Sequence, residues 1–569
     1  MTSDQVDDFK KSLRHTNIDR FHKALDRLRD RNAKTVETPE EAEELETRIR
    51  KIKNHTRSGR VHEHGDSLSQ VNEEAGVAEN LYQGDIALDD TQVDQILGDY
   101  LDGPSVARKK RQASAIYTRW SPAFYYYFDS SLSAAARNVA QLAIDFWQNS
   151  TCITFVQSTT NANRVRFFTG QGCYSYIGMI GGVQDLSLGA GCESVGTAAH
   201  EIGHALGFYH EQSRHDRDNM ISLNRANIAA SALDQFNKET TATNNNYGMP
   251  YDYGSVMQYS EGGFSSNGQP TMIAKITPYQ DTMGGDFVSF YDISMMNQHY
   301  QCKAKCTSGA TCLNGGFRNS RNCAACICPY GWGGATCNQR TPGCGSDLTA
   351  TATVQTLSTS VGAGTAVEQP TFATCNYMIQ APVGQKIEVV LTALGRQQCI
   401  AGCPYTGIEL KAMSDHRYTG IRYCCTNDAT TKIVSEAHLM PVIVYNRYSS
   451  STVTLTYRYV AASTPSTVTV SQVPDAGATY TGSNGGTVTV ATTAKPSGTC
   501  AENANCATWN ANGFCASTVY TLADKQANCP STCGLCNSGV STTTSKAATS
   551  AKVTTTTKKA TVTCTDNAK

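Results

Sequence analysis

The sequence predicts a multidomain chain in which an α+β domain is followed by small disulfide-rich modules and a β-sandwich. Three observations lead to this prediction. The chain has 569 residues, whereas single hydrophobic cores rarely grow beyond about 250 to 300 residues. A histidine-rich motif begins at His200, and many of the 23 cysteines crowd into short windows after Cys302. Because these windows lack the paired spacings of zinc fingers, disulfides are favoured over the alternative of cysteine-bound zinc.

The histidine-rich motif is the segment HEIGHALGFYH, which ends at His210. On a helix, His200 and His204 point the same way, and Glu201 stands beside them. Gly207 lets the chain leave the helix in a conformation that is costly for other residues, which brings His210 round as a third nitrogen ligand. This donor set favours one zinc ion with a fourth position open to water, whose proton Glu201 can accept. The chemistry indicated is amide hydrolysis.

A second signal is SVMQY at residues 255–259, which has the form of a methionine turn. Together, HEIGHALGFYHEQSRHDRD and SVMQY resemble the astacin metalloproteases. The resemblance implies a metzincin catalytic domain with a mixed sheet and an active-site helix. It also implies that Met257 forms an apolar floor under the zinc and that Tyr259 ligates zinc at rest and swings to stabilise the oxyanion. A buried aromatic is the alternative interpretation of Tyr259. Gln258 stands where the family usually has His, and we expect tuning of activity rather than its loss because Gln can still hydrogen-bond.

Residues 1–111 are predicted to form a pro-segment of solvated helices with a narrow apolar stripe. The segment ends in the tetrabasic run RKKR, after which a furin-type convertase would cut between Arg111 and Gln112. A basic run can also be a solvated loop or a nucleic-acid patch. LYQGDI at residues 81–86 resembles the astacin latency motif, which implies that Asp85 is an inhibitory ligand in the open zinc position. Gly-Asp is also an ordinary turn dipeptide.

The catalytic domain is expected at residues 112–302. Hydrophobic patterns predict an aromatic strand region, a helix and two further strands at residues 116–128, 132–146, 153–157 and 164–168. The resemblance pairs Cys152 with Cys302 and Cys173 with Cys192. It also implies that the amino terminus created by cleavage is buried near Glu211. A tripeptide that begins at Asn149 is a glycosylation acceptor.

Two modules are expected after the catalytic domain. At residues 303–340, six cysteines from Cys306 to Cys337 resemble an EGF module. Six cysteines allow fifteen pairings, and only the resemblance selects the first-to-third, second-to-fourth and fifth-to-sixth pattern. Residues 344–460 contain alternating segments such as IEVVLTAL and TVTLTYRYV, which are typical of a β-sandwich. This stretch loosely resembles a CUB domain.

The carboxy-terminal part is predicted to hold a linker, a small domain and a tail. Residues 461–499 are rich in Thr and Ser and too polar to pack. Residues 500–536 carry six cysteines and end in CPSTCGLC, which resembles the six-cysteine toxin-like domain of nematode secreted proteins. An adhesion or targeting module is favoured here over a channel-blocking toxin. Residues 537–569 are expected to be disordered, with Cys564 either unpaired or joined to another chain.

Charge and composition limit the classes of binding partner and the cellular compartment that the sequence favours. A net charge of -1 predicts no general attraction to nucleic acid or to anionic membranes. Runs of about 18 apolar residues are absent from the sequence, so we expect no membrane span. The cysteine content favours a secreted, extracellular protein. The start of the sequence lacks the apolar segment of a signal peptide, and we therefore expect that the true amino terminus lies upstream.

Two functions from different classes are weighed. The first is a secreted zinc endopeptidase, made as a latent zymogen, that acts on extracellular proteins such as those of cuticle, eggshell or matrix. Its EGF, CUB and six-cysteine modules would bind matrix or cuticle components. The second is an adhesion or matrix-binding protein built on an inactive protease scaffold. The signature of that alternative would be a lost base or ligand, whereas all of the residues concerned are present: His200, Glu201, His204, His210 and Tyr259.

The loop at residues 282–289 bears on cleavage preference. Many astacins favour an acidic side chain after the scissile bond and match it with a basic residue in this loop. Here the loop reads TMGGDFVS and contains no arginine. Asp286 would disfavour acidic substrate side chains through contact between like charges. We therefore predict a weak or absent acidic preference.

Overall fold

The computed structural model describes residues 9–35, 37–101, 119–468, 479–481, 487–489, 506 and 532–533. The chain divides into two units, Met1–Val490 and Ala491–Lys569. The predicted cleavage site at Arg111 and Gln112 lies outside the described residues, as do the predicted tail and most of the linker and six-cysteine domain. Among the described residues, no helix has the length and apolar character needed to cross a membrane.

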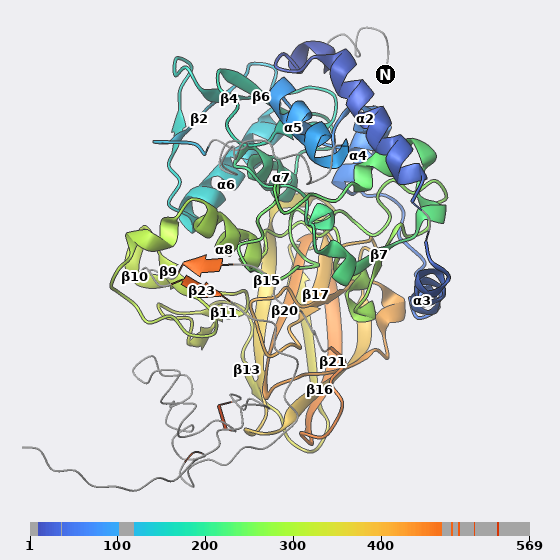
Figure 1. Ribbon diagram of the computed structural model, residues 1–569. Coiled ribbons are helices and arrows are strands. Elements are labelled where there is room, and N and C mark those ends of the chain that lie inside the picture. Colours follow the sequence, from blue (N-terminus) through green and yellow to red (C-terminus); the bar gives the residue numbers. More distant parts are fainter. Residues whose placement is uncertain are drawn as a thin grey trace, which may run out of the picture. The chain divides into compact units, whose positions relative to one another are not determined.

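The predicted pro-segment, called the pro-segment below, is largely helical over its described residues 9–35 and 37–101 and packs against residues 119–302, the central domain (Figure 1). Asn17 caps the first turn of α2, as expected of a short polar side chain at that position. The narrow apolar stripe of α2 is buried, because Phe21, Leu25 and Leu28 pack in one cluster with Tyr209. The pro-segment helices are α2 (Ile18–Ala33), α3 (Pro39–Ile49), α4 (Leu68–Ala75) and α5 (Asp90–Leu101).

A six-stranded mixed sheet forms one layer of the central domain. Its strand order is β1-β5-β6-β4-β2-β3. The first strand comes from the pro-segment and pairs in parallel with β5, with Ile86 opposite Ser175. The pro-segment therefore extends the sheet of the domain that it covers. The strands are β1 (Ile86–Ala87), β2 (Phe124–Phe128), β3 (Phe155–Gln157), β4 (Arg164–Phe168), β5 (Cys173–Tyr176) and β6 (Val183–Leu188).

Helices pack on this sheet and carry the predicted site. In α6 (Ala134–Ser150), the apolar face that the sequence predicted is buried. Trp147 on that face donates a hydrogen bond from Nε1 to the Ala199 carbonyl of α7 (Val195–Ala205), at 3.0 Å. This contact joins the two helices through a buried polar group that is satisfied. The domain also contains α8 (Phe290–His299) and a two-stranded antiparallel sheet of β7 (Ile221–Leu223) and β8 (Met272–Ala274).

Two disulfides close the central domain. Cys152 is bonded to Cys302, and Cys173 is bonded to Cys192. Next along the chain, Cys306–Cys323, Cys312–Cys326 and Cys328–Cys337 follow a first-to-third, second-to-fourth and fifth-to-sixth pattern. This small module contains β9 (Phe317–Asn319), β10 (Asn322–Ile327), β11 (Trp332–Gly333) and β12 (Gln339–Arg340).

The long disulfide is expected to contribute most to stability. Cys152 and Cys302 are 150 residues apart, whereas Cys173 and Cys192 are 19 apart. Loop entropy then predicts losses in the free energy of unfolding of about 5 kcal/mol for the double substitution Cys152→Ser with Cys302→Ser, and about 3 kcal/mol for the second pair. Denaturant unfolding of both double variants checks this order. Equal losses would contradict the loop-entropy account.

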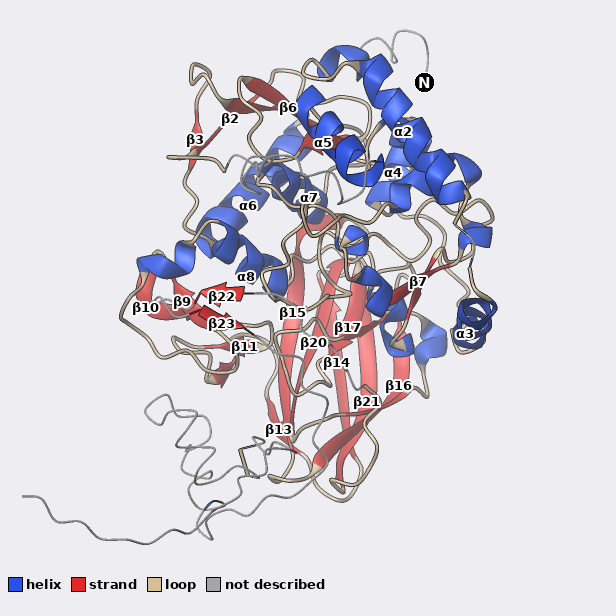
Figure 2. Ribbon diagram, viewed as in Figure 1, coloured by secondary structure: helices blue, strands red, loops and turns tan. Residues whose placement is uncertain are grey.

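Residues 347–460 form a β-sandwich, here called the sandwich, whose long strands lie apart from most of the helices in Figure 2. One sheet has the order β13-β15-β20-β17-β18 and the other β14-β21-β16-β19. Alternating side chains of both sheets fill a shared core, as the period of two in the sequence predicted. The strands are β13 (Asp347–Thr349), β14 (Gln355–Gly362), β15 (Glu368–Gln380), β16 (Lys386–Gly395), β17 (Thr406–Leu410), β18 (Ile421–Tyr423), β19 (Lys432–Val434), β20 (Leu439–Tyr448) and β21 (Ser450–Val460); a separate hairpin has β22 (Thr479–Thr481) and β23 (Thr487–Thr489).

The sandwich packs directly on the central domain through buried polar contacts. The Thr419 hydroxyl donates to Asp252 Oδ2 at 3.0 Å, and both side chains are buried. The backbone N–H of Arg422 donates to the Thr282 hydroxyl, also at 3.0 Å. Such satisfied buried groups fix one relative position of the two parts, because any shift would leave them unpaired.

Candidate active site

The helix α7 places two of the predicted ligands on one face. Ser194 caps it by accepting a hydrogen bond from Thr197 N at 2.9 Å. His200 and His204 then lie one turn apart, and their Nε2 atoms are 2.9 Å from each other. At Gly207 the chain turns away with a φ of 114°, a value that favours glycine. The turn brings His210 back, with its Nε2 atom 3.2 Å from that of His200.

The orientation of the imidazoles fits a bound cation. Nδ1 of His200 lies 2.7 Å from the Val256 carbonyl, and Nδ1 of His204 lies 2.6 Å from the Phe208 carbonyl. A carbonyl can only accept, so each Nδ1 carries the proton and each Nε2 presents a lone pair. Converging lone pairs repel unless a positive ion lies between them. Three imidazole nitrogens in this arrangement suit zinc.

Asp85 of the pro-segment completes this cluster. Its Oδ2 lies 3.0 Å from His200 Nε2 and 3.1 Å from His210 Nε2, while its Oδ1 lies 3.3 Å from His204 Nε2. All four side chains are buried and lie close enough to share one metal ion. A carboxylate at this point could serve as a fourth ligand of a shared metal ion, in the position that an attacking water molecule would need.

The backbone before Asp85 has an unusual conformation that brings the pro-segment close to the site. Gln83 and Gly84 have φ values of 53° and 91°. A Cβ atom on Gly84 would lie 2.5 Å from the ring of Phe264, so only glycine fits without a shift. The Gln83 side chain also accepts a hydrogen bond from His210 Nδ1 at 3.0 Å through its Oε1 atom. Sequence reasoning missed this role of Gln83, although it is adjacent to the Gly-Asp pair.

Glu201 is buried beside the histidines. Its side chain is fully inaccessible, and neither carboxylate oxygen accepts a hydrogen bond within the part of the chain that the structure describes. Burial, reinforced by the charge of Asp85, raises the pKa of Glu201 well above its usual value. A carboxylate in this state is a stronger proton acceptor than one in water.

Met257 and Tyr259 lie beside the histidine cluster. Met257 packs against the backbone of α7, because a Cβ atom on Gly203 would lie 3.0 Å from its sulfur. The ring of Tyr259 lies 4.5 Å from that of His210, and its hydroxyl donates to the Gln83 carbonyl at 2.8 Å. Burial raises the pKa of Tyr259 well above its usual value, so the hydroxyl keeps its proton and remains a donor.

Asp292 holds the methionine turn, and no motif in the sequence points to this role. Its carboxylate accepts hydrogen bonds from the Ser255 hydroxyl at 2.6 Å and from Val256 N at 2.9 Å. Burial raises the pKa of Asp292 to about 6. Gln258, the departure from the family pattern, is buried, and its amide donates to the Tyr259 carbonyl at 3.0 Å.

Glu211, near which the new amino terminus was expected, has other partners in this form. It accepts hydrogen bonds from Asp252 N at 2.8 Å and from Arg214 Nη1 at 3.2 Å. Burial raises the pKa of Glu211 to about 8. Gln112 lies outside the described residues, so its pairing with Glu211 stays a prediction.

The loop that holds Asp286 has a partner that the sequence did not reveal. Asp286 lies in a pocket beside the site, as its position in the loop suggested, but it forms an ion pair with Arg447 of the sandwich, with 2.6 Å between Nη1 and Oδ2. The loop itself has no arginine, yet the folded pocket does. The Asp286 carboxylate is thus paired in the folded pocket, and the weak or absent acidic preference stays a prediction.

Comparisons with known proteins agree with this geometry. Residues 112–301 match the model of the astacin peptidase family, and residues 499–536 match "ShK domain-like". Zinc metalloproteinase nas-31 of Caenorhabditis elegans is 45% identical over 550 residues, which cover 93% of this chain and 85% of that protein. Zinc metalloproteinase nas-32 of the same organism is 38% identical over 531 residues, which cover 88% of this chain and 79% of that protein.

A solved structure is also similar. High choriolytic enzyme 1, a hatching enzyme zinc-protease from the medaka fish Oryzias latipes, is 33% identical, and the match covers 34% of this chain and 98% of that chain with a TM-score of 0.31. The matches to the two nematode proteins confirm the resemblance seen in the sequence, and the inactive-scaffold alternative is not favoured. The chain belongs to the astacin family and is a zinc metalloendopeptidase.

Proposed function

We propose that the chain is made as a latent zymogen of a secreted zinc endopeptidase that hydrolyses extracellular proteins. The observation that carries this proposal is the Asp85 carboxylate, which lies within 3.3 Å of Nε2 of all three histidines. The same segment also binds the Tyr259 hydroxyl. A substrate carbonyl would need both the position that Asp85 occupies beside the histidines and the Tyr259 hydroxyl. The pro-segment and a substrate therefore cannot bind at the same time. The eight disulfides among the described residues support an oxidising, extracellular destination.

The proposed chemistry assigns one role to each residue around the histidines. One zinc ion, held by His200, His204 and His210, would supply the positive charge that polarises a peptide carbonyl and acidifies water. Glu201 takes the proton from the attacking water and passes it to the leaving amine. Tyr259, once released from the Gln83 carbonyl, donates its hydrogen bond to the oxyanion of the substrate. Met257 forms the apolar floor.

Activation would begin with a furin-type convertase that cuts after Arg111. The tetrabasic run before Gln112 supports this step. Removal of the pro-segment would withdraw Asp85 and Gln83 together, because both lie on one short stretch of chain. The modules after residue 302 are proposed to be EGF, CUB and six-cysteine domains that bind matrix or cuticle components. Their disulfides and the β-sandwich support this organisation.

The test is proteolysis of a generic unfolded protein by the purified chain before and after convertase treatment. We expect cleavage only after processing, and we expect a chelator to abolish it and added zinc to restore it. One mole of zinc per mole of chain should be measurable by metal analysis. If the processed chain holds zinc but cuts no better than before treatment, the zymogen proposal is wrong.

The pro-segment is also expected to bind less tightly as the pH rises. The imidazole of His55 is 3% exposed, with Nε2 2.7 Å from Asp281 Oδ2 and Nδ1 2.7 Å from Asn427 Oδ1. Burial by itself lowers the pKa of His55, but the hydrogen bond and charge of Asp281 outweigh it and the net pKa is raised. The free imidazole has a pKa of about 6.5. The contribution of the His55–Asp281 pair to binding of the pro-segment is therefore complete below that pH, and it is lost as the pH rises through the raised pKa.

The measurement is the release rate of the cleaved pro-segment between pH 6 and pH 9. We expect His55→Gln to weaken retention at pH 6 by up to about tenfold and to flatten the pH dependence. His64→Gln, which changes an exposed histidine of the same segment, is the matched control and should behave like wild type. An unchanged pH profile in His55→Gln would show that another group carries it.

A further inference from the structure

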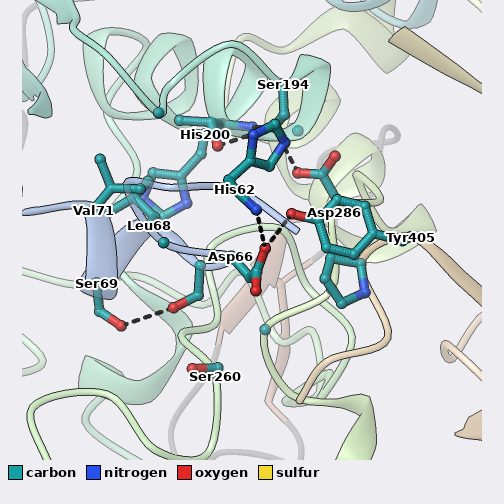
Figure 3. Close-up of a pocket in the computed structure, with 18 of the residues that line it drawn as sticks. His62, Asp66, Leu68, Ser69, Val71, Ser194, His200, Ser260, Asp286 and Tyr405 are labelled. Carbon is teal, nitrogen blue, oxygen red and sulfur yellow. Dashed lines mark hydrogen bonds between the residues drawn. The ribbon is translucent and has the colours of Figure 1, made fainter. Parts of the chain in front are cut away.

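A pocket beside the histidines has walls from both the central domain and the sandwich. With the pro-segment in place, its volume is about 70 Å³, and its lining includes His200 and Tyr259 together with Glu368, Tyr405 and Arg447. Figure 3 shows Tyr405 and Asp286 close to His62 of the pro-segment. The sandwich is therefore part of the surface that a substrate would meet next to the site.

The sheet order explains why these three residues meet. Strands β15, β20 and β17 are neighbours, and each adjacent pair is antiparallel. Glu368 is the first residue of β15, Arg447 is near the end of β20, and Tyr405 directly precedes β17. The start of one strand and the end of its antiparallel neighbour lie at the same end of a sheet. That end of the sandwich faces the pocket.

The guanidinium of Arg447 has its charge already paired within the pocket wall. It lies 2.6 Å from Asp286 Oδ2 and 3.2 Å from Glu368 Oε1, and its side chain is 4% exposed. The second Asp286 oxygen accepts from Ser194 at the start of α7, where a negative charge is favoured. Arg447 is therefore committed to two carboxylates and offers little to an acidic substrate side chain.

The carboxylate of Glu368 also contacts a histidine of the pro-segment. Its Oε2 forms an ion pair with His62 Nε2, while Oε1 remains beside Arg447. The hydrogen bond to Glu368 raises the pKa of His62, so the imidazole favours its cationic form. When the pro-segment leaves, Oε2 loses this partner. The freed carboxylate oxygen then faces the open pocket, where a cationic substrate group could form the same ion pair.

We propose that Glu368 is a specificity-determining residue that selects a basic substrate side chain next to the scissile bond. The inference rests on the proposed function and names the substrate class of that site. The pocket wall that remains after removal of the pro-segment includes Glu193, Asp286 and Glu368 against Arg447, so its charge is negative. A lysine or arginine side chain would replace His62.

The other charged pro-segment residue in the pocket does not point to an acidic substrate. Asp66 accepts hydrogen bonds from Val61 N and His62 N of its own segment, at 3.1 Å and 3.0 Å. Its partner from the pocket wall is the neutral Tyr405 hydroxyl, at 2.7 Å. Asp66 shapes the loop that presents His62, whereas His62 makes the charged contact with the wall.

The first test is peptide-library profiling of the processed full chain. We expect wild type to favour Lys or Arg at one position next to the scissile bond, and Glu368→Gln to reduce that preference at least tenfold with little effect on other peptides. The matched control is Glu388→Gln, which removes a carboxylate of the same sandwich that pairs with Arg458 instead. Loss in both variants, or retained preference in Glu368→Gln, overturns the proposal.

The second test does not depend on turnover, so it separates this inference from the proposed function. A labelled synthetic peptide of residues 57–90 is titrated into processed chains that carry Glu201→Gln, which keeps the peptide intact. Glu368→Gln should weaken binding about tenfold, and a peptide with His62→Leu should lose that difference. If Glu368→Gln weakens both peptides equally, or neither, the assignment of Glu368 is wrong even when the chain cuts no substrate.

Discussion

Glu201→Ala is expected to lower kcat/KM for an unfolded protein substrate by about 10²- to 10⁴-fold, the usual contribution of a general base. The buried carboxylate of Glu201 accepts no hydrogen bond from the described residues, so both of its oxygens are free to accept a proton from the attacking water. The substitution removes none of the three histidines. Zinc content and thermal stability should therefore stay close to those of wild type. The measurement is steady-state proteolysis by the processed chain.

A matched variant isolates the proton transfer. Glu201→Gln keeps the volume and the burial of the side chain but cannot accept a proton at the same strength. We expect it to be as inactive as Glu201→Ala while holding zinc. Activity above about a tenth of wild type in either variant would assign the proton transfer to another group.

Asp85→Ala is expected to give proteolytic activity without convertase treatment. Because the Nε2 atoms present lone pairs, the Asp85 carboxylate beside them would be held by the cation that they share, as its fourth ligand. Losing one charge-assisted interaction of about 1.5 to 3 kcal/mol should shift the equilibrium between the covered and open site by about 10- to 100-fold. The measurement is cleavage of a fluorogenic peptide by the unprocessed chain. Chain length is followed in parallel so that adventitious cutting is detected.

Asp30→Ala is the control for the loss of a pro-segment carboxylate. Asp30 is exposed on α2 and lies outside the histidine cluster, so the unprocessed variant should remain latent. Asp85→Asn should give an intermediate result, since an amide oxygen can still occupy the position without the charge. A fully latent Asp85→Ala would mean that steric coverage by Gln83 and Gly84 is sufficient for inhibition.

Much of the site could be predicted because its chemistry is local in sequence. His200 and His204 are one helical turn apart, Glu201 is adjacent, and Gly207 marks the turn before His210. The latency motif is similarly compact, so Asp85 could be assigned from a resemblance over a few residues. The helix over residues 132–146 and the strands of the sandwich followed from their hydrophobic periods. In each case the residues that decide the outcome stand within one element or one turn.

What only the tertiary structure decided involves partners that are distant in sequence. The apolar stripe of α2 predicted a helix, but the burial of that stripe against Tyr209 depends on docking. The loop sequence around Asp286 shows the carboxylate but not its ion-pair partner Arg447, which lies on β20 of the sandwich. Hydrophobic period and helical spacing determine which face of an element is buried, and they contain no information on what will cover it. The sequence by itself was therefore enough to predict the metal ligands and the base, while the charge of the adjacent pocket was decided by the packing of the sandwich on the central domain.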